Sequence, residues 1–159
     1  MPNLILTNSD LTVEVSEEDY IYLSFYTWML MKANGYVKCN SRQLNKEPLH
    51  KIIARRIGLF GEYIDHKDRN KLNCRRDNLR SASRSESNAN RVLSTPSGYR
   101  GVSWHEPTQK WQASIWKNRK IQYLGWFEDI EDAAKAYDQA AIIVHGNFAV
   151  LNFERSERA

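Results

Sequence analysis

The chain has 159 residues, 42% of them hydrophobic, and carries a net charge of +4 with a pI near 9.1. These values suit one ordinary domain or two small ones and exclude a disordered chain, and two cysteines without a C-x-x-C pair argue against disulfide or Cys-zinc frameworks. The sequence predicts neither a membrane-spanning stretch nor a secretion signal, so we expect a soluble cytoplasmic protein.

The first 43 residues predict short strands and turns around one helix. The run "LTVEVS" (11–16) alternates apolar and polar residues, as a half-buried strand does, and Asn34-Gly35 predicts a turn into a second strand. Between them, "SEEDYIYLSFYTWML" (16–30) begins with Ser16 and acidic residues, which is the pattern of a helix N-terminus. Its aromatic side chains are expected in the core.

The middle of the chain is basic, because residues 44–93 hold 12 basic and 6 acidic side chains. The run "KEPLHKIIARRIGL" predicts a short helix with Pro48 in its first turn and Gly58 at its end. Residues 60–80 are predicted to form a loop-rich segment. The run "RSASRSESNANRV" that follows is compatible with a helix but is polar on all sides, and such a helix needs a surface such as DNA to lie against. Clustered basic charge is typical of nucleic-acid binders, and a solvated basic face is the alternative.

The run "LSTPSG" predicts a domain boundary at 93–98, between a domain at 1–92 and another at 99–159. Three strand-like runs follow, and an acidic-capped helix with an apolar stripe then ends at Gly146. Alternation in the second strand turns Trp111, Ala113 and Ile115 toward this helix and their neighbours outward. The predicted fold class is therefore α+β.

The runs "LHKIIARRIG", "IDHKDRNKLNCRRDNLR" (64–80) and "SASRSESNANR" resemble the HNH family of endonucleases, in particular the phage and intron homing type. The resemblance implies a ββα-metal nuclease fold that hydrolyses DNA phosphodiester bonds with one divalent cation, Mg²⁺ or Mn²⁺. On the family pattern, His66 is the general base, Asp65 is a metal ligand and Asn78 orients the imidazole. The alternatives are a capped turn with a surface histidine, and an asparagine that caps its own loop.

The chain departs from the family at Ser87, where relatives usually have an asparagine as the second metal ligand. A hydroxyl is a weaker ligand than an amide carbonyl, so the metal is held loosely, Asn88 or Asn90 substitutes, or the site has lost activity. Arg80 and Arg84 are predicted to contact phosphates, with a solvated basic face as the alternative. His50 is interpreted as a structural histidine and Asn73 as a turn residue.

Residues 99–153 resemble an AP2 domain, a DNA-binding module of plant transcription factors and homing endonucleases, through "YRGV", "LG", "AYD" and "LNF". The resemblance implies a three-stranded antiparallel sheet lying in the major groove with a helix behind it. It assigns DNA contacts to the groove-facing positions Arg100, Ser103, His105, Ser114, Trp116 and Tyr123. The basic residues Lys117, Arg119 and Lys120 form a turn that is well placed to contact phosphates. Ser103, His105 and Trp116 replace arginines of the family, which weakens any transfer of its GC-rich target preference. Trp116 packing on a neighbouring strand is the alternative.

Together these patterns predict a site-specific, homing-type DNA endonuclease that acts as a monomer and nicks one strand of double-stranded DNA. It is expected to need neither a membrane nor a small-molecule substrate, and the resemblance implies a bacterium or a phage-infected host. The alternative is a weakened or inactive, sequence-specific DNA-binding protein on the same fold. A role directed at RNA is a third possibility, which competition between DNA and RNA duplexes would test.

Overall fold

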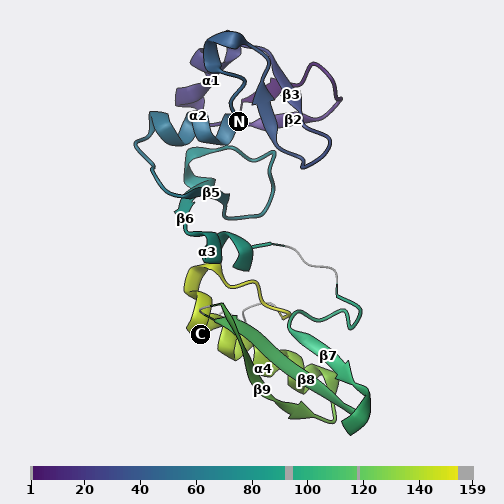
Figure 1. The fold of residues 1–159 in the computed structure, drawn as a ribbon. Helices are drawn as coiled ribbons and strands as arrows, with labels where there is room; N and C mark the ends of the chain where they lie inside the picture. The colour runs from purple at the N-terminus through teal and green to yellow at the C-terminus, as the bar shows by residue number, and fades with distance from the viewer. Residues whose placement is uncertain (1, 92–94, 118, 154–159) are drawn as a thin grey trace. The chain divides into compact units, whose positions relative to one another are not determined.

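The computed structural model describes residues 2–91, 95–117 and 119–153, and the chain divides into two compact units, Met1–Ser87 and Asn88–Ala159 (Figure 1). The predicted break at 93–98 begins with two residues that lie outside the described ranges, as do residue 92 and the C-terminal six. The domain limits 1–92 and 99–159 therefore stay a prediction. Within the described ranges, no helix is long and apolar enough to cross a membrane.

The first unit is built from short elements around one core. Strands β1 (Asn3–Ile5) and β2 (Thr12–Glu14) pair antiparallel, as do β3 (Trp28–Leu30) and β4 (Val37–Cys39). The alternation predicted for the stretch before Ser16 is confirmed, since Val13 and Val15 are buried while Thr12 is exposed and Glu14 is half-buried.

Helix α1 (Glu17–Ser24) is shorter than the predicted run 16–30. The helix ends at Ser24 because Trp28 packs into the core of the unit. The Trp28 side chain is 1% exposed, and its indole N–H donates to the Leu23 carbonyl at 2.9 Å. Tertiary packing therefore converts the end of the predicted helix into β3. The Ser16 hydroxyl makes no cap bond and instead accepts from the Arg76 N–H at 3.0 Å.

Helix α2 (Leu49–Arg56) confirms the second prediction, with Pro48 at its N-terminal boundary. Its buried face contributes Leu49, Ile52 and Ile53 to the core of the unit. This packing sets α2 against the next strand of the chain.

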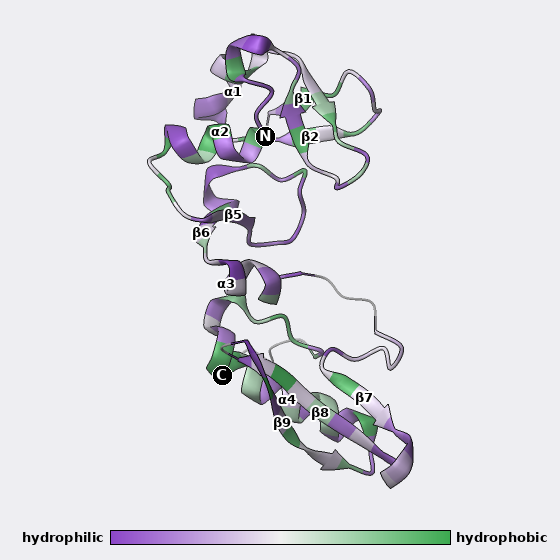
Figure 2. Ribbon diagram, in the orientation of Figure 1, coloured by the Kyte–Doolittle hydropathy of each residue, from purple (hydrophilic) through white to green (hydrophobic). Residues whose placement is uncertain are grey.

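Strands β5 (Tyr63–His66) and β6 (Leu79–Ala82) form an antiparallel pair inside the segment expected to be loop-rich. The residues between them are coloured hydrophilic along most of their length in Figure 2, with a turn of 3₁₀ helix at Arg76–Asn78. Helix α3 (Arg84–Ala89) follows, and Ser83 and Glu86 cap its start reciprocally at 2.7 and 3.3 Å.

The second unit is a three-stranded antiparallel sheet covered by one helix. The sheet order is β7 (Val102–His105), β8 (Lys110–Lys117), β9 (Lys120–Phe127), and helix α4 spans Ile130–His145. Asp129 caps α4 by accepting from two backbone N–H groups, and Gly146 ends it, as predicted. The α+β class is confirmed. In β8, Ala113 and Ile115 are buried against the helix side while Trp116 is 63% exposed, which confirms the predicted alternation.

Candidate functional site

The β5–β6 pair presents the acid and the imidazole from adjacent positions. Asp65 lies directly opposite Arg80, and His66 opposite Leu79. Successive side chains of a strand point to opposite faces, so the carboxylate and the ring leave β5 on different sides. Arg80 holds the carboxylate: its Nε and Nη2 both lie 3.0 Å from Asp65 Oδ2. Arg80, predicted to contact phosphate, is thus also an ion-pair partner within the site.

His66 is enclosed by side chains from three other segments. It is 3% exposed, and its Nε2 lies 3.6 Å from Cys74 Sγ. The centroid of its ring lies 5.3 Å from that of His50, on α2, and 6.0 Å from that of Tyr36. His50 in turn lies 4.8 Å from Tyr36. Sequence reasoning set His50 aside and did not single out Tyr36 or Cys74. The position of His50 beside the buried Leu49 was the one signal that it faces inward.

Burial controls the protonation of this cluster. It lowers the pKa of His66, against the opposing charges of Asp68 and Asp65. It lowers the pKa of His50 to about 3, with His66 and Lys51 adding to the effect, and raises the pKa of Cys74 to about 12. Near neutral pH both imidazoles are therefore uncharged and the thiol keeps its proton. A neutral imidazole can accept a proton, which is what a general base requires.

The side chain of Asn78 organises the loop between β5 and β6. Its amide donates to Asp68 Oδ1 at 2.9 Å and to the Asn73 carbonyl at 2.7 Å, and its oxygen accepts from the Asp68 N–H at 3.1 Å. Asn73 donates to Asp68 Oδ2 at 2.8 Å. These are the bonds of the loop-capping interpretation; the imidazole-orienting role of Asn78 stays a prediction.

The candidate metal ligands are few. Asp65 and Ser87 offer a carboxylate and a hydroxyl, both hard oxygen donors of the kind that Mg²⁺ accepts, and Ser87 is half-buried in α3. Within residues 2–91, 95–117 and 119–153, no three His, Cys, Asp or Glu side chains are grouped to hold a metal ion. Mg²⁺ commonly binds through one or two carboxylates, with waters and substrate phosphates completing its shell, so this donor set fits a sparse site.

The arginines of the basic block have different surroundings. Arg76 is bound to Asp19, which is 0% exposed, at 2.6 Å and 2.9 Å, and Arg56 donates to the same carboxylate at 2.8 Å. Burial raises the pKa of Asp19, but hydrogen bonds and charge from the two guanidinium groups outweigh it and lower that pKa. Arg75 pairs with Asp77, whereas Arg84 is exposed. Arg76 is thus a structural residue of the first unit.

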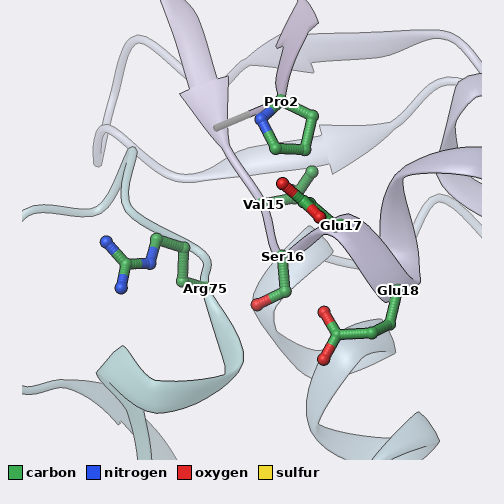
Figure 3. Close-up of a pocket in the computed structure, with 6 residues that line it drawn as sticks. All are labelled: Pro2, Val15, Ser16, Glu17, Glu18 and Arg75. Atoms are coloured by element: carbon green, nitrogen blue, oxygen red, sulfur yellow. The ribbon is translucent and has the colours of Figure 1, made fainter.

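A pocket at the start of α1 includes Arg75 of this basic block, and Figure 3 shows its lining: Pro2, Val15, Ser16, Glu17, Glu18 and Arg75. The lining holds two carboxylates, of Glu17 and Glu18, and one guanidinium group, of Arg75. Because the carboxylates repel phosphate groups, this pocket is poorly suited to bind a DNA backbone.

The residues predicted to contact DNA in the second unit lie mostly on the outer face of its sheet. Ser114 is directly opposite Tyr123, which is 65% exposed, and Ser103 is exposed on β7. The ring of His105 lies 4.4 Å from that of Trp126, and its Nδ1 lies 2.9 Å from Thr108 Oγ1. The predicted turn residues are all exposed: Lys117, Arg119 and Lys120.

Arg100 is held inside the second unit. Its guanidinium donates to the Tyr137 hydroxyl at 2.9 Å, to the Ala89 carbonyl at 2.9 Å and to the carbonyl of Arg91. The Asn152 side chain binds both backbone groups of Arg100. Its oxygen accepts from the Arg100 N–H at 2.6 Å, and its amide nitrogen donates to the Arg100 carbonyl at 3.1 Å. A contact between Arg100 and DNA stays a prediction, and it would require these internal bonds to break.

Comparison with known proteins supports both parts of the resemblance. The sequence model of the HNH endonuclease family matches residues 59–89, which include the β5–β6 pair and α3. APETALA2-like protein 2 of Oryza sativa subsp. indica is 44% identical over 64 residues, 40% of this chain and 15% of the relative. Two AP2-like ethylene-responsive transcription factors of Arabidopsis thaliana, TOE2 and AIL7, are 43% and 50% identical over 60 and 58 residues. Those matches cover 38% and 35% of this chain and 12% of each relative.

Proposed function

We propose that the chain is a metal-dependent DNA endonuclease of the homing type, which binds duplex DNA through its second unit and nicks one strand with its first. The match of the HNH endonuclease family to residues 59–89 carries this proposal. The similarity to AP2-like transcription factors supports the DNA-binding half. One active site per chain implies a nick, and a double-strand break would need a second copy or a second visit.

His66 is the proposed base. It takes a proton from the attacking water as the water oxygen bonds to phosphorus and the bond from phosphorus to the 3′ oxygen breaks. Its lowered pKa supports this role, because the imidazole is neutral before the reaction. Cys74 and His50, packed against the ring, hold its orientation.

Asp65 and Ser87 are the residues that would hold the divalent cation. When bound, Mg²⁺ or Mn²⁺ would polarise the phosphate and stabilise the leaving oxygen. Arg80, which now pairs with Asp65, would keep this carboxylate in place and lie near the phosphate. Arg84 and the turn residues Lys117, Arg119 and Lys120 supply exposed positive charge for the backbone.

A plasmid assay tests the proposal. Supercoiled DNA incubated with the protein and Mg²⁺ or Mn²⁺ should relax, and EDTA should stop the reaction. Replacing His66 by alanine should slow nicking by about 10²–10⁴-fold, the usual contribution of a general base, while binding measured in EDTA is kept. His145→Ala, which removes a histidine of the second unit, is the matched control, and this variant should nick DNA at the normal rate. Equal nicking by wild type and His66→Ala would end the catalytic assignment.

A DNA-binding protein with a weakened or inactive site is the second candidate. Ser87 in place of the usual asparagine favours it. Such a protein binds duplex DNA equally with and without EDTA and gives no product with any divalent ion. The variant Ser87→Asn separates a weakened site from a lost one, because only a weakened site should gain activity.

A further inference from the structure

The strands β8 and β9 form a two-stranded ribbon whose outer face carries a row of directly opposed side chains. Gln112 faces Trp126, Ser114 faces Tyr123, and Trp116 faces Ile121 across the ribbon. The inner face is taken by α4, against which Ala113 and Ile115 are buried. The row of opposed side chains on the outer face consists of Gln112, Ser114, Trp116, Ile121, Tyr123 and Trp126.

None of the six side chains of this row is charged, and four of them are large and mainly apolar. Trp116 and Tyr123 are 63% and 65% exposed, and Ile121 and Trp126 are 46% and 45% exposed. The charged residue on the same side of β8, Lys110, lies at the start of the strand and is paired with Glu128 at 2.8 Å. The exposed cations of the ribbon instead gather at its turn, where no ion pair between described residues engages them: Lys117, Arg119 and Lys120.

The chemistry of such a row matches one kind of base pair. The major groove of DNA is about 12 Å wide and admits a two-stranded ribbon. Guanine is read there by arginine or lysine, adenine by the amide of glutamine or asparagine, and thymine by apolar contact with its C5-methyl group. The outer row offers one amide, at Gln112, one hydroxyl, at Ser114, and four large, mainly apolar surfaces, but no guanidinium group. The cations at the turn suit phosphates, which every sequence has.

We infer that the outer face of the β8–β9 ribbon selects thymine-rich A·T duplexes, by packing Trp116, Ile121 and Tyr123 against thymine methyl groups in the major groove. This inference rests on the proposed function, since it concerns the same DNA-binding unit. Exposed aromatic rings can also stack on the bases of single strands, and the experiment below distinguishes that use.

The test measures the affinity of the full chain, in EDTA, for four probes: poly(dA-dT), poly(dA-dU), poly(dG-dC) and single-stranded poly(dT). The first two duplexes differ only in the C5-methyl group. Each methyl group that the ribbon covers should tighten binding about fourfold, so poly(dA-dT) should bind at least about fourfold more tightly than poly(dA-dU). It should also bind more tightly than poly(dG-dC).

Variants assign the effect to the ribbon. Trp116→Ala and Tyr123→Ala remove exposed side chains and should bring the affinity ratio of poly(dA-dT) to poly(dA-dU) close to one. Ile143→Ala removes an apolar side chain that is 81% exposed on α4, and it should leave the ratio unchanged. Trp116→Arg should shift the preference toward poly(dG-dC), because it adds a guanine reader.

Equal affinity of the wild type for poly(dA-dT) and poly(dA-dU) would overturn the inference and leave duplex binding standing. Tighter binding of poly(dT) than of any duplex would also overturn it, in favour of base stacking. Failure to bind any of the duplexes would instead overturn the proposed function.

Discussion

In the unit that holds Asp65 and His66, charged and polar side chains are turned inward, whereas in the second unit large aromatic side chains are turned outward. The first unit buries Asp19, His50 and His66 completely or nearly so. The second covers the inner face of its sheet with the alanine-rich face of α4 and leaves the outer face exposed. Each unit thus binds a buried carboxylate to internal partners, Asp19 in the first and Asp138 in the second, but among the described residues only the first unit buries imidazoles, and the second offers an aromatic surface.

The cost of burying polar groups explains why the first unit is so interconnected. A buried polar atom without a partner is destabilising by about 1–3 kcal/mol, and more if it is charged. Among the described residues, no buried side-chain nitrogen or oxygen lacks a hydrogen-bond partner. The charged interior should consequently be the more sensitive of the two units to single substitutions.

The largest effect is expected at Asp19, the carboxylate shared by Arg56 and Arg76. Asp19→Ala leaves two guanidinium groups without their buried partner and should destabilise the first unit by about 3–5 kcal/mol. Hydrogen exchange read by mass spectrometry, peptide by peptide, should show faster exchange in α1 and α2 and no change in β8. Arg55→Ala is the control, since it removes a largely exposed ion pair to Glu47 and should cost about 1 kcal/mol or less.

A backbone position should give the next effect, in the second unit. Gly101 has φ +71°, and a Cβ built there would lie 2.0 Å from the ring of Tyr137 and 2.7 Å from the Ser114 carbonyl oxygen. Gly101→Ala should therefore destabilise this unit by at least about 2 kcal/mol, seen as a lower thermal midpoint. Gly98→Ala is the matched control, with φ +76° but nothing within 4 Å of the added carbon. A midpoint lowered equally by both variants would mean that backbone strain, and not the close approach to Tyr137, accounts for the loss.

Acid should weaken the first unit through His50. Its folded pKa of about 3 lies below the ordinary 6.5, so between these values the unfolded chain binds a proton that the folded chain lacks. From pH 6.5 downward, the free energy of unfolding should fall by about 1.4 kcal/mol per pH unit for this one group. Urea titrations of wild type and His50→Gln between pH 7 and 5.5 measure it, and the variant should show the flatter dependence. Parallel curves would show that another group carries the pH dependence.

The smallest effect is expected at the exposed turn of the second unit. Lys120→Ala should weaken binding to all duplexes alike and reduce the slope of log affinity against log salt by about 0.9. Lys135→Ala, on α4 and paired with Asp132, should change neither quantity. A loss confined to one sequence would show that Lys120 reads bases.

Periodic patterns made much of the fold predictable. The alternation in β8, the alanine-rich stripe of α4 and the caps at Asp129 and Gly146 are all local, and each is confirmed. Where a long-range contact competed, local reasoning was wrong: the helix expected over 16–30 ends early because Trp28 pairs into β3 and fills the core. The adjacency of Asp65 and His66 could also be read directly from the chain.

The α+β class, most local strands and helices, and the neighbouring acid and imidazole were predictable from the residues alone, because period, caps and adjacency depend on residues close in the chain. The surroundings of these residues depend instead on tertiary contacts. The tertiary structure placed Cys74 and His50 against His66, Arg80 across from Asp65 and Arg76 on Asp19. These contacts depend on how loops close and on which buried charges find partners, and no local pattern encodes either.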